Sequence, residues 1–115
     1  MELTIKDKLQ NFTFGIKFVR ELDKKFFIEK DGVKFGAGLS TKLVELYSGS
    51  VVALADILHC ATTTESKRAS LADIEEYVES CDDVEKLIED VLDEIESNNA
   101  GKLTAKEIKE AMKKA

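Results

Sequence analysis

The sequence predicts an α+β protein that is mostly helical, with N-terminal β-hairpins followed by a small bundle of four to six helices. The dipeptide Asp31-Gly32 indicates a hairpin, because both central residues of a type I′ turn need positive φ. That turn places Ile28 opposite Phe35. Elsewhere, apolar residues recur at helical spacing between capping and glycine signals. The 115 residues contain no proline and no linker-like stretch. They therefore predict one domain, with a hairpin–helix–hairpin over 1–36 and a helical part over 39–115.

The first predicted elements are two paired strands and a helix. The strands are expected over Met1–Lys6 and Leu9–Phe14, although the turn between them lacks the glycine that a tight hairpin favours. A short amphipathic helix follows, because apolar residues are spaced by one, three and four positions. Its apolar face consists of Phe18, Val19, Leu22 and Phe26.

Two consecutive helices are expected after the Asp-Gly hairpin. Ser40 is the predicted N-cap of the first, with Leu39 and Val44 as a hydrophobic staple. Gly49 ends that helix, and Ser50 can cap the next one. The second helix is apolar on nearly all sides, which predicts that it lies at the centre of the protein. Its apolar residues are Val51, Val52, Leu54, Ala55, Ile57, Leu58 and Ala61.

The polar segment 62–69 is expected to be a loop. Ser70 and Asp73 resemble a capping box and predict the start of another helix. The longest helix is predicted over 82–97, with an apolar stripe that favours the core over a coiled-coil interface. That stripe consists of Val84, Leu87, Ile88, Val91, Leu92 and Ile95.

A last helix is predicted near the C-terminus. Gly101 is the expected stop of the preceding helix. Thr104 and Glu107 then form a further capping box, with Leu103 and Ile108 as its hydrophobic staple.

The same residues allow an alternative interpretation as a degenerate EF-hand. If Gly101 is the sixth position of such a loop, the loop covers residues 96–107 and ends at Glu107. Ala100, however, stands where an oxygen ligand is needed. The alternative function is therefore a small acidic helical module that binds calcium weakly.

Charge is segregated along the chain, although the net charge is only −6. Residues 73–96 hold twelve acidic residues against a single lysine, Lys86, whereas residues 97–115 hold five lysines and two acids. An acidic middle repels phosphate backbones and argues against a nucleic-acid partner. It is either a solvated helix face or a surface that meets a basic partner. The second interpretation allows homo-oligomers, in which this surface meets another copy's lysine-rich end.

Catalytic, metal and membrane roles find little support in the sequence. The single histidine, His59, neighbours Cys60 on a helix, where adjacent side chains point about 100° apart. We expect no catalytic residues, no metal site and no cofactor, and we expect Cys60 and Cys81 to be free thiols. No apolar run approaches the roughly 20 residues that cross a membrane. The N-terminus has no signal-peptide layout, so a cytosolic protein is expected.

Four segments together resemble the tail assembly chaperones of long-tailed, siphovirus-type bacteriophages. The resemblance is closest to the branch found in phages and prophages of Gram-positive bacteria. It covers most of the chain and becomes weaker in the acidic second half. The segments that carry it are MELTI, FTFGIKFVRELDKK, DGVKFGAGL and LVELYSGSVVALADIL.

The resemblance implies a non-catalytic role in tail morphogenesis. Such proteins bind the tape measure protein, help to recruit tail tube subunits around it, and leave before the tail is complete. The chain would then act in the cytoplasm of the bacterial host and be absent from the finished virion.

The candidate partner-binding residues lie in the last helix and in the acidic helix before it. In the last helix they are Ile108 and Met112 on one face, with Lys106 and Lys109 beside them. A terminal, partly apolar helix of this kind is expected to have low local stability. An equally good interpretation is that Ile108 and Met112 simply pack on the core. The acidic helix contributes Asp90 and Asp93.

Overall fold

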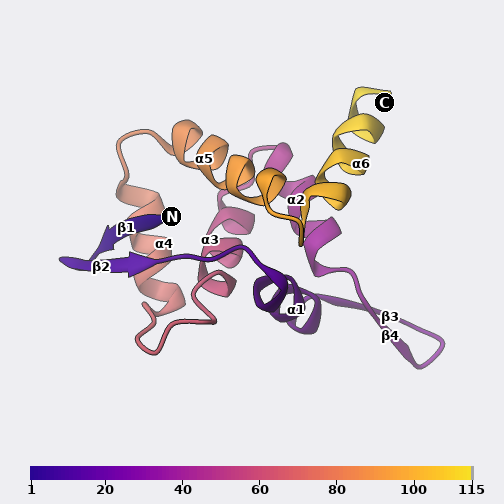
Figure 1. Ribbon diagram of the computed structural model, residues 1–115, viewed down its shortest axis with the longest axis horizontal. Coiled ribbons are helices and arrows are strands. Elements are labelled where there is room, and N and C mark those ends of the chain that lie inside the picture. Colours follow the sequence, from indigo (N-terminus) through magenta and orange to yellow (C-terminus); the bar gives the residue numbers. More distant parts are fainter. Residues whose placement is uncertain (115) are drawn as a thin grey trace.

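Two short β-hairpins stand at opposite ends of a group of six helices in the computed structural model, which describes residues 1–114 (Figure 1). The molecule measures 43 × 32 × 24 Å along its principal axes. The predicted fold class, α+β and mostly helical, is confirmed. The strands are β1 (Glu2–Ile5), β2 (Lys8–Asn11), β3 (Phe27–Lys30) and β4 (Val33–Gly36). The helices are α1 (Ile16–Lys25), α2 (Gly38–Tyr47), α3 (Val51–Cys60), α4 (Leu71–Ser80), α5 (Val84–Ser97) and α6 (Lys102–Lys113).

The β1–β2 hairpin forms without a glycine in its turn. Lys6 and Asp7 both adopt positive φ, 52° and 61°, and Ile5 pairs with Lys8. The predicted second strand was too long, because pairing ends at Asn11 and Phe12 lies beyond it. There the backbone turns to other partners, and Phe12 N donates to Met1 O at 2.8 Å.

The β3–β4 hairpin confirms the Asp-Gly prediction. Asp31 and Gly32 have φ values of 54° and 78°, and Ile28 pairs with Phe35 as expected. This hairpin has no covering layer, since every residue of its two strands is exposed. It projects from the body of the molecule beyond α1 (Figure 1).

The start of α2 differs from the prediction. Ser40 lies inside the helix and does not cap it. The cap comes from α1, because the Asp23 carboxylate accepts a hydrogen bond from Leu39 N at 3.0 Å. Gly38 is required for a close approach, since a Cβ there would lie 2.1 Å from the backbone oxygen of Leu22. Gly38, the first residue of α2, therefore allows the close packing of α2 on α1.

The predicted staple at the start of α2 is also wrong. Leu39 is buried in the core, whereas Val44 is 45% exposed on the other side of the helix. Because α2 begins at Gly38 and not after Ser40, Leu39 and Val44 do not flank the start of the helix. The end of the helix follows the prediction, because Gly49 adopts a φ of 88° directly after the C-cap residue Ser48.

Helix α3 lies at the centre, as its composition predicts. Ser50 caps it by accepting a hydrogen bond from Ala53 N at 3.1 Å. Helices α1, α2 and α4 all pack against α3. Its first turn is the exception, because Val51 and Val52 are largely exposed. The residues that α3 buries are Ala53, Leu54, Ala55, Ile57, Leu58 and Cys60.

Helices α4 and α5 form close to their predicted positions. Ser70 caps α4 as expected, by accepting a hydrogen bond from Asp73 N at 3.1 Å. Helix α5 begins two residues later than predicted, with the Asp83 carboxylate accepting a hydrogen bond from Lys86 N. The apolar stripe of α5 faces the core, as expected. Leu87, Val91 and Ile95 are buried, and Val84, Ile88 and Leu92 are partly buried.

The end of α5 at Ser97 agrees with the predicted range of 82–97, but the start of α6 was predicted wrongly. Helix α5 ends at Ser97, and Gly101 occupies the N-cap position of α6. Thr104 lies inside α6 and caps nothing, and Leu103 is 69% exposed, so no staple with Ile108 forms. Gly101 has a φ of −123° rather than the positive φ of a helix-stop glycine, and a Cβ there would lie 2.9 Å from the side chain of Ile95.

Candidate partner-binding surfaces

The calcium interpretation is contradicted by the backbone. An EF-hand needs a twelve-residue loop between two helices. Here residues 102–107 belong to α6, so only four residues separate the helices. Glu96, the expected first ligand, is engaged elsewhere. It accepts a hydrogen bond from Tyr47 Oη at 2.7 Å and pairs with Lys109 Nζ at 3.4 Å. These contacts tie α2, α5 and α6 together.

His59 and Cys60 do not form an activated pair. The Nδ1 atom of His59 lies 3.5 Å from Lys25 Nζ. Burial and the nearby Lys25 and Arg68 cations lower the pKa of His59. Burial raises the pKa of the Cys60 thiol to about 11, which disfavours the thiolate that a nucleophile needs. Both cysteines are free thiols, Cys60 buried and Cys81 partly exposed.

Neither a cluster of metal-ligating side chains nor a membrane-spanning helix is found among residues 1–114. No three or more His, Cys, Asp or Glu side chains there come together in a way that could hold a metal ion. None of the helices in that range combines the length and the apolar character that a membrane span requires.

The candidate residues of α6 lie on two different surfaces. Ala105 is fully buried and Ile108 is partly buried against the core, whereas Met112 is 38% exposed. Helix α6 thus packs on α2 and α5 through its first turns. Lys106 and Lys109 line a shallow groove of about 490 Å³, which also contains the exposed Leu103. The lining of this groove therefore combines several lysine side chains with one exposed apolar side chain.

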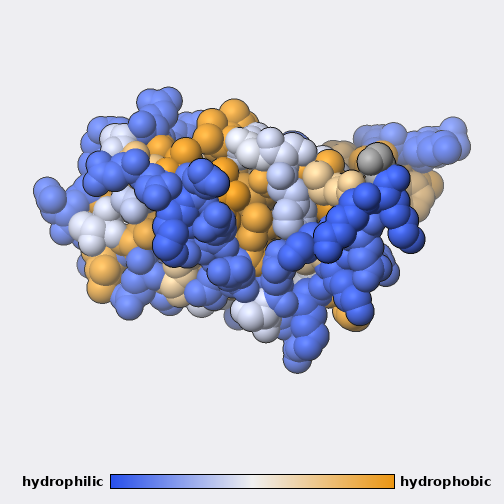
Figure 2. All heavy atoms as spheres, turned by 90° about the horizontal axis from the view of Figure 1, so that it is seen from above, coloured by the Kyte–Doolittle hydropathy of each residue, from blue (hydrophilic) through white to orange (hydrophobic). Residues whose placement is uncertain are grey.

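Asp90 and Asp93 line a separate groove of about 420 Å³, between α5 and the first residues of the chain. Asp90 forms an ion pair with Lys86 one turn earlier in the same helix. The structure therefore does not bring the two aspartates together with the lysines of α6. Seen from above, the molecule is covered largely by hydrophilic atoms, with hydrophobic atoms gathered near the middle (Figure 2).

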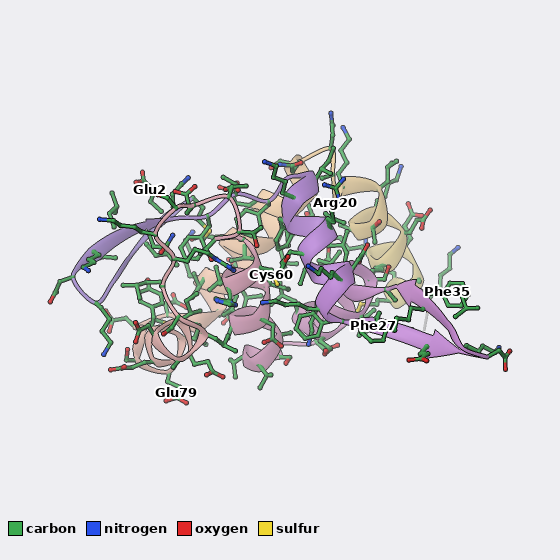
Figure 3. All side chains as sticks on the ribbon, turned by 90° about the horizontal axis from the view of Figure 1, so that it is seen from below. Glu2, Arg20, Phe27, Phe35, Cys60 and Glu79 are labelled. Atoms are coloured by element: carbon green, nitrogen blue, oxygen red, sulfur yellow. The ribbon has the colours of Figure 1, made fainter. Side chains whose placement is uncertain are left out.

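The β3–β4 hairpin carries a group of exposed apolar side chains that was not recognised as a surface from the sequence. Ile28, Val33 and Phe35 are 55%, 52% and 54% exposed. Because side chains alternate along a strand, the pairing places all three on one face, together with Lys30. We call this set the hairpin face. Phe27 is on the opposite face, where Lys34 Nζ lies 4.7 Å from its ring centroid. Figure 3 shows Phe35 on the projecting part of the hairpin and Phe27 at its base, beside the helices.

The position of this hairpin is fixed at its base. Gly36 lies so close to α1 that a Cβ there would be 2.8 Å from Cβ of Asp23. Gly36 shares a face with Phe27, so that face is turned toward α1 at the base and the hairpin face is turned away. The alternation of apolar residues in the sequence could have indicated the two faces of the hairpin. The sequence does not show, however, that both faces are left exposed.

Comparison with known proteins identifies one family. A family model described as phage tail assembly chaperone protein (TAC) matches residues 2–110. No curated protein and no solved structure matches the chain. The family match covers all six helices apart from the last residues of α6.

Proposed function

The chain belongs to the phage tail assembly chaperone family, and we propose that it binds the tape measure protein and helps to recruit tail tube subunits without catalysing a reaction. It acts in the cytoplasm of the bacterial host and leaves before the virion is complete. The host group that fits the sequence resemblance best is the Gram-positive bacteria.

The hairpin face is the observation that best supports this proposal. A protein that holds another polypeptide temporarily needs an apolar contact area that stays accessible, and exposed apolar patches commonly mark such sites. Such a protein must also stay soluble itself, and the high content of charged residues in this chain favours solubility. A small apolar contact area surrounded by charged residues binds weakly enough for another partner to displace it later, as the role of an assembly factor requires.

We also propose supporting contacts on α6 and α5. Lys106, Lys109 and the exposed Met112 offer a basic and partly apolar edge to a tail protein. Ile108 holds that edge to the core through its buried part. Asp90 and Asp93 offer an acidic surface elsewhere, which suits a basic partner such as the α6 of another copy. In that case self-association would weaken as the salt concentration rises.

Deleting the gene tests the proposed function in its biological setting. We expect a prophage that lacks it to release heads without tails, because the tape measure protein is not kept available for tube assembly. Electron microscopy of induced lysates measures this, and a plasmid copy of the gene should restore tails. Mass spectrometry of purified virions should detect tube subunits but not this chain. Normal tails from the deletion strain would refute the proposal.

A further inference from the structure

We propose that the hairpin face binds one amphipathic helix of the partner, and that this helix carries acidic side chains beside its apolar stripe. The inference rests on the proposed function, which makes the tape measure protein the source of the helix. It identifies a binding element, Ile28, Val33 and Phe35, and the chemistry of what covers it.

The dimensions of the hairpin face match one helix. Two paired strands lie about 4.8 Å apart, so with their side chains they present a strip about 10 Å wide. The diameter of a helix with its side chains is about 10–12 Å. Ile28 and Phe35 lie directly opposite each other, and Val33 lies two residues from Phe35 on the same face. The three side chains form a short apolar strip of the kind that packs on an i, i+3, i+4 stripe.

The β3–β4 hairpin is expected to have low local stability as long as no partner covers it. A two-stranded hairpin is at best marginally stable in water, and independent stability requires further strands or a packed helix. In this chain the base is held to α1, but the strands themselves remain exposed on both faces. A partner helix on the hairpin face supplies the missing layer and removes three half-exposed apolar side chains from water.

The charges around the hairpin favour an acidic partner. The β3–β4 hairpin and α6 together contain six Lys residues and four Asp or Glu residues. Helices α4 and α5 contain ten acidic residues and one lysine. The hairpin and α6 project at the same end of the long axis (Figure 1). Acidic side chains beside the apolar stripe would therefore meet a complementary field.

A second copy of the chain fits this face less well. Two hairpin faces packed against each other would bring two ends with an excess of positive charge together, with Lys30 on each face. The acidic helix α5 of another copy has suitable charge, but its buried stripe residues, Leu87, Val91 and Ile95, are already in the core. The occupant is therefore a helix from a different protein.

The test uses the full chain and overlapping fragments of the tape measure protein encoded by the same phage genome. In the double variant, Ile28 and Phe35 are both replaced with serine. Leu9→Ser is the matched control, because Leu9 is also an exposed aliphatic residue on a hairpin strand, 70% exposed. Circular dichroism should show that both variants stay folded. Affinities are measured by calorimetry at low and high salt.

We expect at least one fragment with an acidic amphipathic helix to bind the wild type, and the double variant to bind it about tenfold or more weakly. Leu9→Ser should bind like the wild type, and high salt should weaken binding. If the wild type binds a fragment and the folded double variant binds equally well, the hairpin assignment is wrong. Binding that does not change with salt concentration would show that acidic side chains beside the apolar stripe do not contribute to it. If only wild-type self-association is lost in the double variant, a second copy is the occupant. Absence of any wild-type binding would instead count against the proposed function itself.

Discussion

Gly38→Ala is expected to lower the free energy of unfolding by about 3 kcal/mol, because the added methyl group has no space to occupy. Its Cβ would lie 2.1 Å from the Leu22 carbonyl oxygen and 2.8 Å from Asp23 N. These are backbone atoms of α1, so no side chain can rotate to make room. The two helices would have to separate, which would also lengthen the hydrogen bond from Leu39 N to Asp23.

Gly15→Ala is the matched control for this variant. Gly15 also lies at the start of a helix, at the N-cap position of α1, but a Cβ there meets nothing within 4 Å. Urea unfolding followed by circular dichroism measures both variants. We expect the midpoint of Gly15→Ala to lie close to that of the wild type, while the midpoint of Gly38→Ala falls sharply. Equal midpoints for the two variants would show that α1 and α2 do not approach each other as described.

Leu54→Ala is expected to cost about 3–4 kcal/mol, in the middle of the range for fully buried leucines. Leu54 is fully buried on α3, the helix against which α1, α2 and α4 all pack. Truncation would leave a cavity lined by several elements, and such a cavity collapses incompletely. The same unfolding experiment measures the effect.

Val52→Ala provides the comparison within the same helix. Val52 is 67% exposed, so its truncation should change the free energy of unfolding by less than about 0.5 kcal/mol. A large effect at Val52 together with a small effect at Leu54 would mean that α3 presents the opposite face to the core. A single transition in each of these urea unfolding curves would also support the prediction that residues 1–115 form one cooperative domain.

The elements that were predicted well depend on local chemistry. Ser50 and Ser70 cap α3 and α4 through backbone groups three residues away, and Asp31-Gly32 sets its own turn. Such interactions join near neighbours in sequence, so a pattern of residue types is enough to locate them. The same holds for the apolar stripe of α5, whose spacing alone indicates the buried face.

The elements that were predicted wrongly depend on contacts between distant residues. The cap of α2 is Asp23, sixteen residues before Leu39 in sequence. Lys42 also could not be recognised as a buried residue. It is 8% exposed, with its ammonium group 3.0 Å from Asp56 and 4.2 Å from the ring centroid of Phe26. The packing of α2 on α3 brings Lys42 to Asp56, and the packing of α2 on α1 brings it to Phe26.

The candidate site shows the same division. The pairing of Ile28 with Phe35 followed from the turn, and it placed both side chains on one face. Whether that face is covered depends on where α1 ends and how Gly36 packs, which no local pattern records. Among the residues proposed on α6, Ile108 is partly buried and Met112 is exposed, and this difference depends on how the helix packs on α2 and α5.

The solubility of the tape measure protein, produced with and without this chain, tests most directly whether the chain holds that protein. We expect the tape measure protein to sediment when it is produced alone, and co-expression to move it to the supernatant in a complex that co-purifies with this chain. A tape measure protein that remains in the pellet in the presence of well-folded chain, with no complex recovered, would show that the chain does not act as its chaperone.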